Sequence, residues 1–455
     1  MFSKLLIVLT LVTLTGAGCG GASQAEQLAT KQAKLKVWGV YDSGDAFRKI
    51  MDDYQKLHKN VSFEYTELRF DEYEDELVRA FAEGRGPDIY AVHNTWIGKY
   101  QSLMQPMPDS VKIPFVETRG TIKKETFYTL QEKPTLSLRA LKSEFVDVVI
   151  GDVVRPYQDM KEKTERPRVF GLPLSVDTMA LYYNKELLDA AGFPEPPKTW
   201  VEFQNQVTKL SKVGVNNTIN QSGAAIGTSK NVERSFDILS LLMMQNGVQM
   251  ENERHLASFA SGTEEQNALA LDAVQFYTDF ANPTKEVYTW NEDQLPSFDA
   301  FVSGKTAFFF GYAYHAPLIK AASPKLNYAV ASMPQIENSK VVNYANYWVE
   351  VVAKATENSD WAWDFIQFAS SKDHVVDYLT ATKKPTARRD LISTQIEDED
   401  LSAFVSQTLT AASWYKGKNA AVAEQAFETL INASLAGEDI EPVINLTQNK
   451  INQTF

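Results

Sequence analysis

The sequence predicts an α/β fold, because expected strands and helices alternate along its first hundred residues. Residues 35–40, 61–65 and 87–92 have the short apolar or alternating patterns of strands. Between them, 46–56 and 73–83 carry apolar side chains near helical spacing. Strands that alternate with helices at this spacing predict a mostly parallel sheet with helices on its faces.

The same kind of pattern continues to the end of the chain. Residues 171–183 form a long strand-like run, 236–246 and 265–281 predict strong helices, and the tail from 359 is mainly helical. Residues 101–165 are less regular and predict an added loop or hairpin region. We therefore expect more than one α/β unit.

Composition limits the possible functions. Hydrophobic residues make up 44% and charged residues 23% of the chain, which is typical of a soluble globular protein. Residues 19–455 suffice for two or three domains of about 150 residues each. The net charge of -13 argues against a nucleic-acid partner, and one cysteine with five scattered histidines offers neither a disulfide nor a metal site. We expect no cofactor.

The N-terminus has the pattern of an export signal. Lys4 precedes the ten-residue apolar run 5–14, and the small residues 15–18 follow directly before Cys19. The run is shorter than the roughly 20 residues of a membrane span. The stretch TGAGC resembles the lipobox of bacterial lipoproteins, in which a signal peptidase cuts before a cysteine that is then diacylated, although Gly16 stands where leucine is usual.

From this we predict a signal peptide over 1–18, a lipid-modified Cys19 and a flexible tether of small and polar residues over 19–34. An ordinary secretory signal with an incidental cysteine is the alternative. The predicted location is extracytoplasmic, with the lipid anchor as the single membrane contact.

Four motifs occur in a fixed order further along the chain. They are GRGPDI at 84–89, GLPLS with LYYNK between 171 and 185, PPKTWVEF at 196–203, and FVSGKTA at 301–307. On these motifs the chain resembles the family 1 extracellular solute-binding proteins, the sugar-binding components of ABC importers related to the maltose-binding proteins. The resemblance covers about 35–450, and 101–165 is longer than the usual segment there.

This resemblance implies a two-lobed periplasmic-binding-protein type II fold, in which each lobe is a mostly parallel sheet flanked by helices and crossing strands form a hinge. The first lobe would comprise 35–176 and 349–382, with 101–165 as an insertion, and the second 177–348 and 383–455. The resemblance further implies a binding protein, not an enzyme, that passes a small ligand to membrane permease subunits. We expect a monomer.

Sugars are bound by aromatic rings against their C–H faces and by polar side chains at their hydroxyls. Ligands of such sheets bind beyond the carboxyl ends of the strands, so we searched strand exits and crossing strands. The candidate ligand-binding residues are Trp38, Asp42, Asn94, Trp96, Asp177, Trp290, Tyr312, Tyr314, Tyr347, Trp348 and Arg388. Alternatives are a core position for Trp38, a surface loop for Trp290 and a surface ion pair for Arg388.

Little in the sequence indicates an enzyme. Gly304-Lys305-Thr306 is the end of a phosphate-loop pattern, but Asp299 replaces its first glycine, so we interpret it as a helix-ending turn. No Gly-x-Ser-x-Gly occurs. Two alternatives to a sugar receptor remain: the same fold binding a polyamine, peptide or other small solute, which Asp42 and Asp177 keep open, and a surface enzyme acting on polysaccharide.

Overall fold

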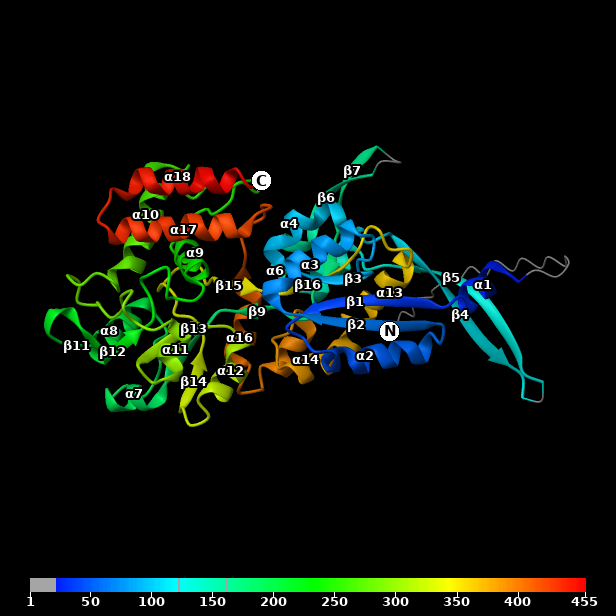
Figure 1. Cartoon of the computed structure of the whole chain (residues 1–455), viewed down its shortest axis with the longest axis horizontal. Coiled ribbons are helices and arrows are strands. Elements are labelled where there is room, and N and C mark those ends of the chain that lie inside the picture. Colours follow the sequence, from blue (N-terminus) through cyan, green and yellow to red (C-terminus); the bar gives the residue numbers. More distant parts are fainter. Residues whose placement is uncertain (1–21, 122, 160–162) are drawn as a thin grey trace, which may run out of the picture.

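Two lobes lie side by side and the chain crosses between them more than once (Figure 1). The computed structural model describes residues 22–121, 123–159 and 163–455, so the predicted signal peptide and Cys19 lie outside the described residues. Each lobe contains a five-stranded sheet, and a three-stranded sheet of order β17-β15-β9 lies between them. The predicted two-lobed α/β fold is confirmed.

The first lobe has the sheet order β2-β1-β3-β16-β8. Its strands are β1 (Ala33–Val40), β2 (Val61–Leu68), β3 (Ile89–His93), β8 (Gly171–Leu172) and β16 (Trp348–Val352). Its helices are α2 (Gly44–Leu57), α3 (Phe70–Ala82), α4 (Ile97–Tyr100), α13 (Ser359–Ala369) and α14 (Lys372–Thr382). β1 pairs in parallel with β2 and β3, as the sequence predicts.

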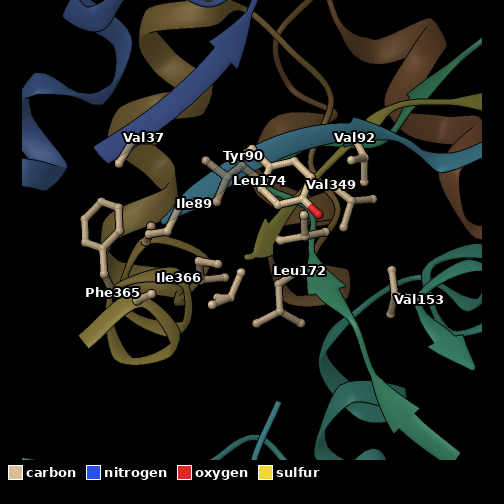
Figure 2. Close-up of a cluster of buried hydrophobic side chains, with 14 of the residues drawn as sticks. Val37, Ile89, Tyr90, Val92, Val153, Leu172, Leu174, Val349, Phe365 and Ile366 are labelled. Carbon is tan, nitrogen blue, oxygen red and sulfur yellow. The ribbon is translucent and has the colours of Figure 1, made fainter. Parts of the chain in front are cut away.

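The core of this lobe lies between the sheet and α13 (Figure 2). Val37, Tyr90, Leu172 and Val349 come from four neighbouring strands, and Phe365 comes from the helix. All are almost fully buried. The sheet face is therefore closed by apolar packing, which places the polar strand ends at the edge that faces the other lobe.

The second lobe has the sheet order β11-β12-β13-β10-β14. Its strands are β10 (Ala180–Asn184), β11 (Lys212–Val213), β12 (Ile219–Ala224), β13 (Thr306–Gly311) and β14 (Tyr328–Ala331). Its helices are α7 (Lys185–Ala190), α8 (Trp200–Leu210), α9 (Ser235–Gln245), α10 (Glu264–Asp279), α11 (Ser297–Val302), α12 (His315–Ala322), α16 (Ser402–Gln407), α17 (Ala420–Leu435) and α18 (Ile440–Asn452).

Both sheets are mixed, whereas the sequence favoured mostly parallel ones. In the first sheet the reason is the crossing strand, and in the second it is the crossing strand together with β11, which runs antiparallel to β12. β16 enters the first lobe from the second and runs antiparallel to β3 and β8, and β10 enters the second lobe from the first and runs antiparallel to β13 and β14.

Short elements complete the hinge region and the loops. The hinge strands are β9 (Asp177–Thr178), β15 (Asn343–Asn346) and β17 (Ala411–Ala412), and α15 covers Ile392–Gln395. Single 3-10 turns occupy Asn94–Trp96, Gln101–Leu103, Val215–Asn217, Arg389–Leu391 and Thr408–Thr410.

Local signals in the sequence set two helix ends, and the second of them is the turn that the sequence predicts. Thr199 caps α8, because its hydroxyl oxygen accepts a hydrogen bond from the Glu202 amide at 3.2 Å. Gly304 has a φ of 70° and ends α11 before β13 begins at Thr306. This confirms that Gly304-Lys305-Thr306 is a helix-ending turn.

Residues 22–34, the described part of the predicted flexible tether, are not extended coil throughout. They contain α1 (Gln24–Thr30), whose first turn is capped by the Ser23 hydroxyl. The Asn60 side-chain amide donates to the carbonyls of Leu28 and Lys31 at 3.2 and 3.1 Å, which fixes the helix to the first lobe. Small and polar residues thus form a docked helix, because the body supplies hydrogen bonds to its end.

The described residues between 101 and 169 include two antiparallel hairpins that project from the first lobe (Figure 1). The longer joins β4 (Ser110–Arg119) to β5 (Glu125–Pro134), and the shorter joins β6 (Val154–Asp159) to β7 (Thr164–Val169). Between them lie α5 (Leu138–Glu144) and α6 (Asp147–Val153). None of the helices in the described part of the chain is long and apolar enough to cross a membrane.

We expect Phe203→Ala to lower the free energy of unfolding by about 3–5 kcal/mol, because the ring is fully buried against Trp200, Phe280 and Phe308. The matched control is Val201→Ala on the same helix, where the side chain is 61% exposed and the change should stay within about 0.5 kcal/mol. Thermal unfolding followed by circular dichroism measures both. Equal shifts in the two variants would contradict the assignment of this core.

Candidate functional site

Four aromatic side chains gather where the strands of the first lobe end. Tyr41 follows β1, Phe70 begins α3, Trp96 follows β3 and Trp348 begins β16. Phe70 stacks between Tyr41 and Trp96, with ring centroids 5.7 and 6.0 Å apart, and Trp348 meets Trp96 edge-on at 5.4 Å. We call these four residues the lobe 1 aromatic cluster. Tyr41 is 63% and Phe70 48% exposed, so the cluster presents ring surface to solvent.

Tyr41 has an unusual backbone conformation. Its φ of 66° is in the left-handed region, which is costly for a residue with a β-carbon. The Tyr65 hydroxyl donates to the carbonyl of the next residue, Asp42, at 2.7 Å and so holds this turn. The turn directs an apolar ring outward, an arrangement that packing alone does not require.

The second lobe contributes a charged and aromatic group. Arg234 donates to both carboxylate oxygens of Asp237 at 2.8 Å, and the Tyr312 hydroxyl donates to the same carboxylate at 2.5 Å. Tyr314 stacks on Tyr312 with centroids 6.0 Å apart and remains 43% exposed. We call Arg234, Asp237, Tyr312 and Tyr314 the lobe 2 polar group.

A chain of hydrogen bonds connects the two sets. His93 at the end of β3 contacts the Asn346 side-chain oxygen through Nε2 at 3.0 Å, and the Asn346 amide donates to Asp237 at 3.5 Å. Burial lowers the pKa of His93 to about 4, so its imidazole is neutral at physiological pH. His93 also forms an edge-on contact with Trp348 at 5.6 Å. The lobe 1 aromatic cluster and the lobe 2 polar group therefore border one region between the lobes.

A buried ion pair joins the lobes beside this region. Asp152 on α6 pairs with Lys416, and both side chains are at most 5% exposed. Tyr347 donates to the same carboxylate at 2.6 Å, Ser413 at 2.6 Å and Asn94 at 3.2 Å. Every donor that Asp152 needs comes from protein, which is the condition for burying a carboxylate without a large penalty.

Two further carboxylates lie at the crossings. Asp177 on β9 accepts hydrogen bonds from the amides of Thr178 and Ala313, both at 2.9 Å. Burial raises the pKa of Asp177 to about 7, although these amides oppose the rise. Asp42 accepts from Lys384 at 2.5 Å and from the Tyr378 hydroxyl at 2.6 Å.

A known protein family matches most of this chain. The family model described as bacterial extracellular solute-binding protein matches residues 39–375. The chain belongs to this family. Its members bind solutes and are not enzymes.

Related sequences and structures agree with this assignment. A putative binding protein of Brucella abortus is 23% identical over 249 residues, 52% of this chain and 56% of that protein, so the chain spans about half the length of such relatives. The galactooligosaccharide-binding protein of Bacillus subtilis is 20% identical over 385 residues, 84% of this chain and 79% of that protein.

Two solved structures share the fold. A cyclo/maltodextrin-binding protein complexed with maltotetraose has a TM-score of 0.69 at 17% identity, covering 93% of this chain and 97% of that chain. The sugar-binding protein MalE of Xanthomonas citri has a TM-score of 0.68 at 17% identity, with the same coverage.

The structure of this solute-binding protein brings together most of the sequence-predicted site residues. Trp96 and Trp348 are in the lobe 1 aromatic cluster, and Tyr312 and Tyr314 are in the lobe 2 polar group. Asp42, Asn94, Asp177 and Tyr347 lie around them in the hydrogen-bond networks of the crossings and of Asp152.

Three predicted site residues lie elsewhere. Trp38 packs in the core of the first lobe, and Trp290 is fully buried in the second, where its indole donates to Asn231 at 3.1 Å. Arg388 is 5% exposed, pairs with Glu144 and Asp390, and lines a separate cavity of about 540 Å³ beside α5 and α14. Burial removes the first two from solvent, and ion pairing occupies the third.

Several residues at the site were not among the predicted ones, namely Tyr41, Phe70, His93, Arg234, Asp237 and Asn346. A signal existed for one pair. Arg234 precedes the predicted helix 236–246 and Asp237 falls in its first turn, a spacing at which two side chains can meet. Among the described residues, no three His, Cys, Asp or Glu side chains gather as a metal site.

The carboxyl group of Glu350 predicts how the stability of the protein depends on pH. This residue lies on β16 near Asp42, and burial first, then the Asp42 carboxylate, raise its pKa to about 8, while Lys384 opposes the rise. An acid with a raised pKa holds its proton in the folded state over pH values where the unfolded chain has lost it. Stability should therefore fall as pH rises from about 4.5 to 8 and then level off.

Glu350→Gln should flatten this dependence, because the substituted amide does not titrate. The measurement is the melting temperature at intervals between pH 5 and 8.5, with the exposed Glu357→Gln as control. Parallel profiles for wild type and Glu350→Gln would show that this carboxyl is ionised throughout.

Proposed function

We propose that this protein is the receptor of an ABC importer and binds a mono- or oligosaccharide in the region between its lobes. The observation that carries the proposal is the pair of exposed aromatic surfaces on the two lobes. Tyr41 and Phe70 present ring area from one side and Tyr314 from the other. Aromatic rings suit the C–H faces of a sugar, and neighbouring polar groups suit its hydroxyls.

The charges around the site favour a neutral ligand. Asp237 is bonded to Arg234, Asp42 to Lys384 and Asp152 to Lys416. A polyamine would need exposed carboxylates that lack a cationic partner. These three already have one, and Asp177, which accepts from two backbone amides, is buried. A hydroxyl-rich, uncharged ligand can hydrogen-bond to such paired groups without displacing them.

The relatives support the ligand class. The Bacillus subtilis relative is named for galactooligosaccharides, and one structural neighbour was solved with maltotetraose. In our proposal, Trp348 and Tyr41 contact sugar rings, and Arg234, whose side chain is 29% exposed and also pairs with Glu424, bonds hydroxyls. The crossing strands would act as a hinge, so that ligand contacts made by both lobes stabilise the closed arrangement.

We also propose that Cys19 carries a lipid and holds the receptor at the outer face of the cell membrane. The support is the sequence before it, a charged start, a ten-residue apolar run and small residues up to the cysteine. Delivery to a permease requires only that the receptor remain close to the membrane.

A ligand screen by thermal shift tests the sugar proposal. An oligosaccharide present at about 100 times its dissociation constant should add about 2.7 kcal/mol to stability and raise the melting temperature. Maltooligosaccharides, galactooligosaccharides and monosaccharides form the test set, and spermidine and short peptides form the comparison set. A shift with spermidine or peptides and none with sugars would contradict the proposal.

With the sugar identified, Tyr41→Ala and Tyr314→Ala should each weaken its binding by roughly 10-fold or more, because each removes a ring that faces the ligand. Both rings are well exposed, so the melting temperature of the free protein should change little. Phe115→Ala is the matched control, since Phe115 is 52% exposed and lies on the β4–β5 hairpin. Calorimetric titration measures the three constants, and equal affinities would exclude the two tyrosines from the site.

Cys19→Ala should prevent lipid attachment, so the chain should be released from the membrane fraction or remain unprocessed. Cell fractionation and mass spectrometry of the N-terminus measure this. Normal processing together with retention in the membrane fraction would contradict the anchor, while the sugar proposal would be unaffected.

A further inference from the structure

The β4–β5 hairpin is a long two-stranded ribbon whose outer half has little protein around it. Its strands pair from Ser110 with Pro134 to Arg119 with Glu125. Towards the tip, Phe115, Val116 and Phe127 are 52%, 51% and 43% exposed. An isolated two-stranded hairpin is marginally stable in water. Exposed apolar side chains on such a ribbon indicate a surface that binds another protein or a membrane.

The strand register places apolar side chains on both faces. Phe115 lies opposite Thr129, and Phe127 lies opposite Glu117, so the two phenylalanines share one face. Val116 lies opposite Tyr128 on the other face. No apolar core covers this outer half, in contrast to Val111 and Ile113 at the base of β4, which are buried.

The charge of the hairpin differs in sign from that of the whole chain. Residues 110–134 contain five basic and three acidic side chains, a net charge of +2, whereas the chain as a whole carries -13. Arg119, Lys123 and Lys124 lie next to the turn, where Arg119 also sits over the Phe127 ring at 5.4 Å. A basic, partly apolar ribbon on an acidic protein is complementary to an anionic lipid surface.

Helix α1 links this hairpin to the N-terminus. It contacts both β4 and β5, and Figure 1 shows it beside the two strands. The Ser23 hydroxyl caps its first turn, and the Asn60 amide fixes its other end to the first lobe. The docked helix thus begins at Gln24, only a few residues after Cys19, and the hairpin lies beside it.

Chain length then limits the distance to the membrane. Four residue steps separate Cys19 from Ser23, and they span at most about 14 Å when fully extended. A lipid on Cys19 would therefore hold Ser23, at the start of α1, within about that distance of the bilayer surface, and α1 places the hairpin beside it. A flexible tether over 19–34 would have allowed more than three times this reach.

We infer that the β4–β5 hairpin is a membrane-contact element, which rests on anionic lipid headgroups and fixes the orientation of the anchored receptor. This inference rests on the lipid anchor of the proposed function. Its basic residues would meet lipid phosphates, and its aromatic residues would enter the headgroup layer. Contact through both the hairpin and the lipid would give the receptor one orientation on the bilayer, because it could not rotate freely about the lipid.

The single cysteine of the chain allows a direct test. When Cys19 is acylated, a cysteine introduced elsewhere is the only free thiol. Thr118→Cys and Thr129→Cys place one on each face of the hairpin, and Val215→Cys, at an 84% exposed site in the second lobe, is the control. Each is labelled with an environment-sensitive fluorophore, and the lipidated full chain is reconstituted in vesicles of phosphatidylglycerol and phosphatidylethanolamine.

We expect at least one hairpin label to shift its emission to the blue and to be quenched by spin-labelled lipid, and the Val215 label to do neither. Adding Lys123→Glu and Lys124→Glu should reduce this quenching by at least half, as should replacing phosphatidylglycerol with phosphatidylcholine. Water-like emission of both hairpin labels in the acylated chain would overturn the inference. So would hairpin variants that lose solute uptake with the permease but keep full lipid quenching, because the hairpin would then serve the permease.

Failure of this inference can be distinguished from failure of the anchor proposal and of the sugar proposal. Mass spectrometry of the same samples reports whether Cys19 is acylated, and an unmodified cysteine would overturn the anchor and the hairpin inference together. Calorimetric titration with sugar should be unchanged by Lys123→Glu and Lys124→Glu, because the hairpin is remote from Tyr41 and Tyr314. A chain that binds no sugar would contradict the receptor proposal and leave the lipid result standing.

Discussion

The arrangement of the two lobes depends on how a few buried carboxylates are paired. Asp237 is fully buried and would be costly there without partners, yet Arg234, Tyr312 and Asn346 all donate to it. Arg234 keeps 29% of its side chain exposed, and Tyr312 supports the exposed ring of Tyr314, so neutralising one buried charge positions a cation and an aromatic ring at the site. Asp152 does the same on the other side, where it requires donors from both lobes. The same hydrogen bonds therefore satisfy the buried charges and position the side chains of the site.

Aromatic residues serve two different purposes in this protein, and their burial separates them. Trp290 and Trp38 fill cores, and Phe203 packs among other rings. Tyr41 instead lies outside the core in a strained left-handed conformation, which a hydrogen bond from Tyr65 helps to hold. Strain of this kind costs stability and is expected where a ring must stand at a ligand surface.

The sequence predicted the fold well because its signals were local or periodic. Helix starts such as Thr199 and helix ends such as Gly304 depend on neighbours within a few residues. The positions of the candidate site residues were predicted less well, since strand exits indicated Trp96 and Tyr314, which keep exposed surface, and equally Trp290, which is buried. Whether a tryptophan after a strand faces solvent depends on which distant segments cover it. His93 and Asn346 are 253 residues apart, and no local pattern connects them. The order of α1 was missed for the same reason, because its end is fixed by Asn60.

The position of β16 has a consequence for how the protein folds. This strand lies between β3 and β8 in the first sheet, but in the sequence it follows all five strands of the second sheet. The first sheet cannot close until residue 352 is present, so a chain that emerges from its N-terminus has no complete lobe for most of its synthesis. Closure of the first sheet therefore joins residues that are far apart in the sequence, and such non-local pairings are slow to form.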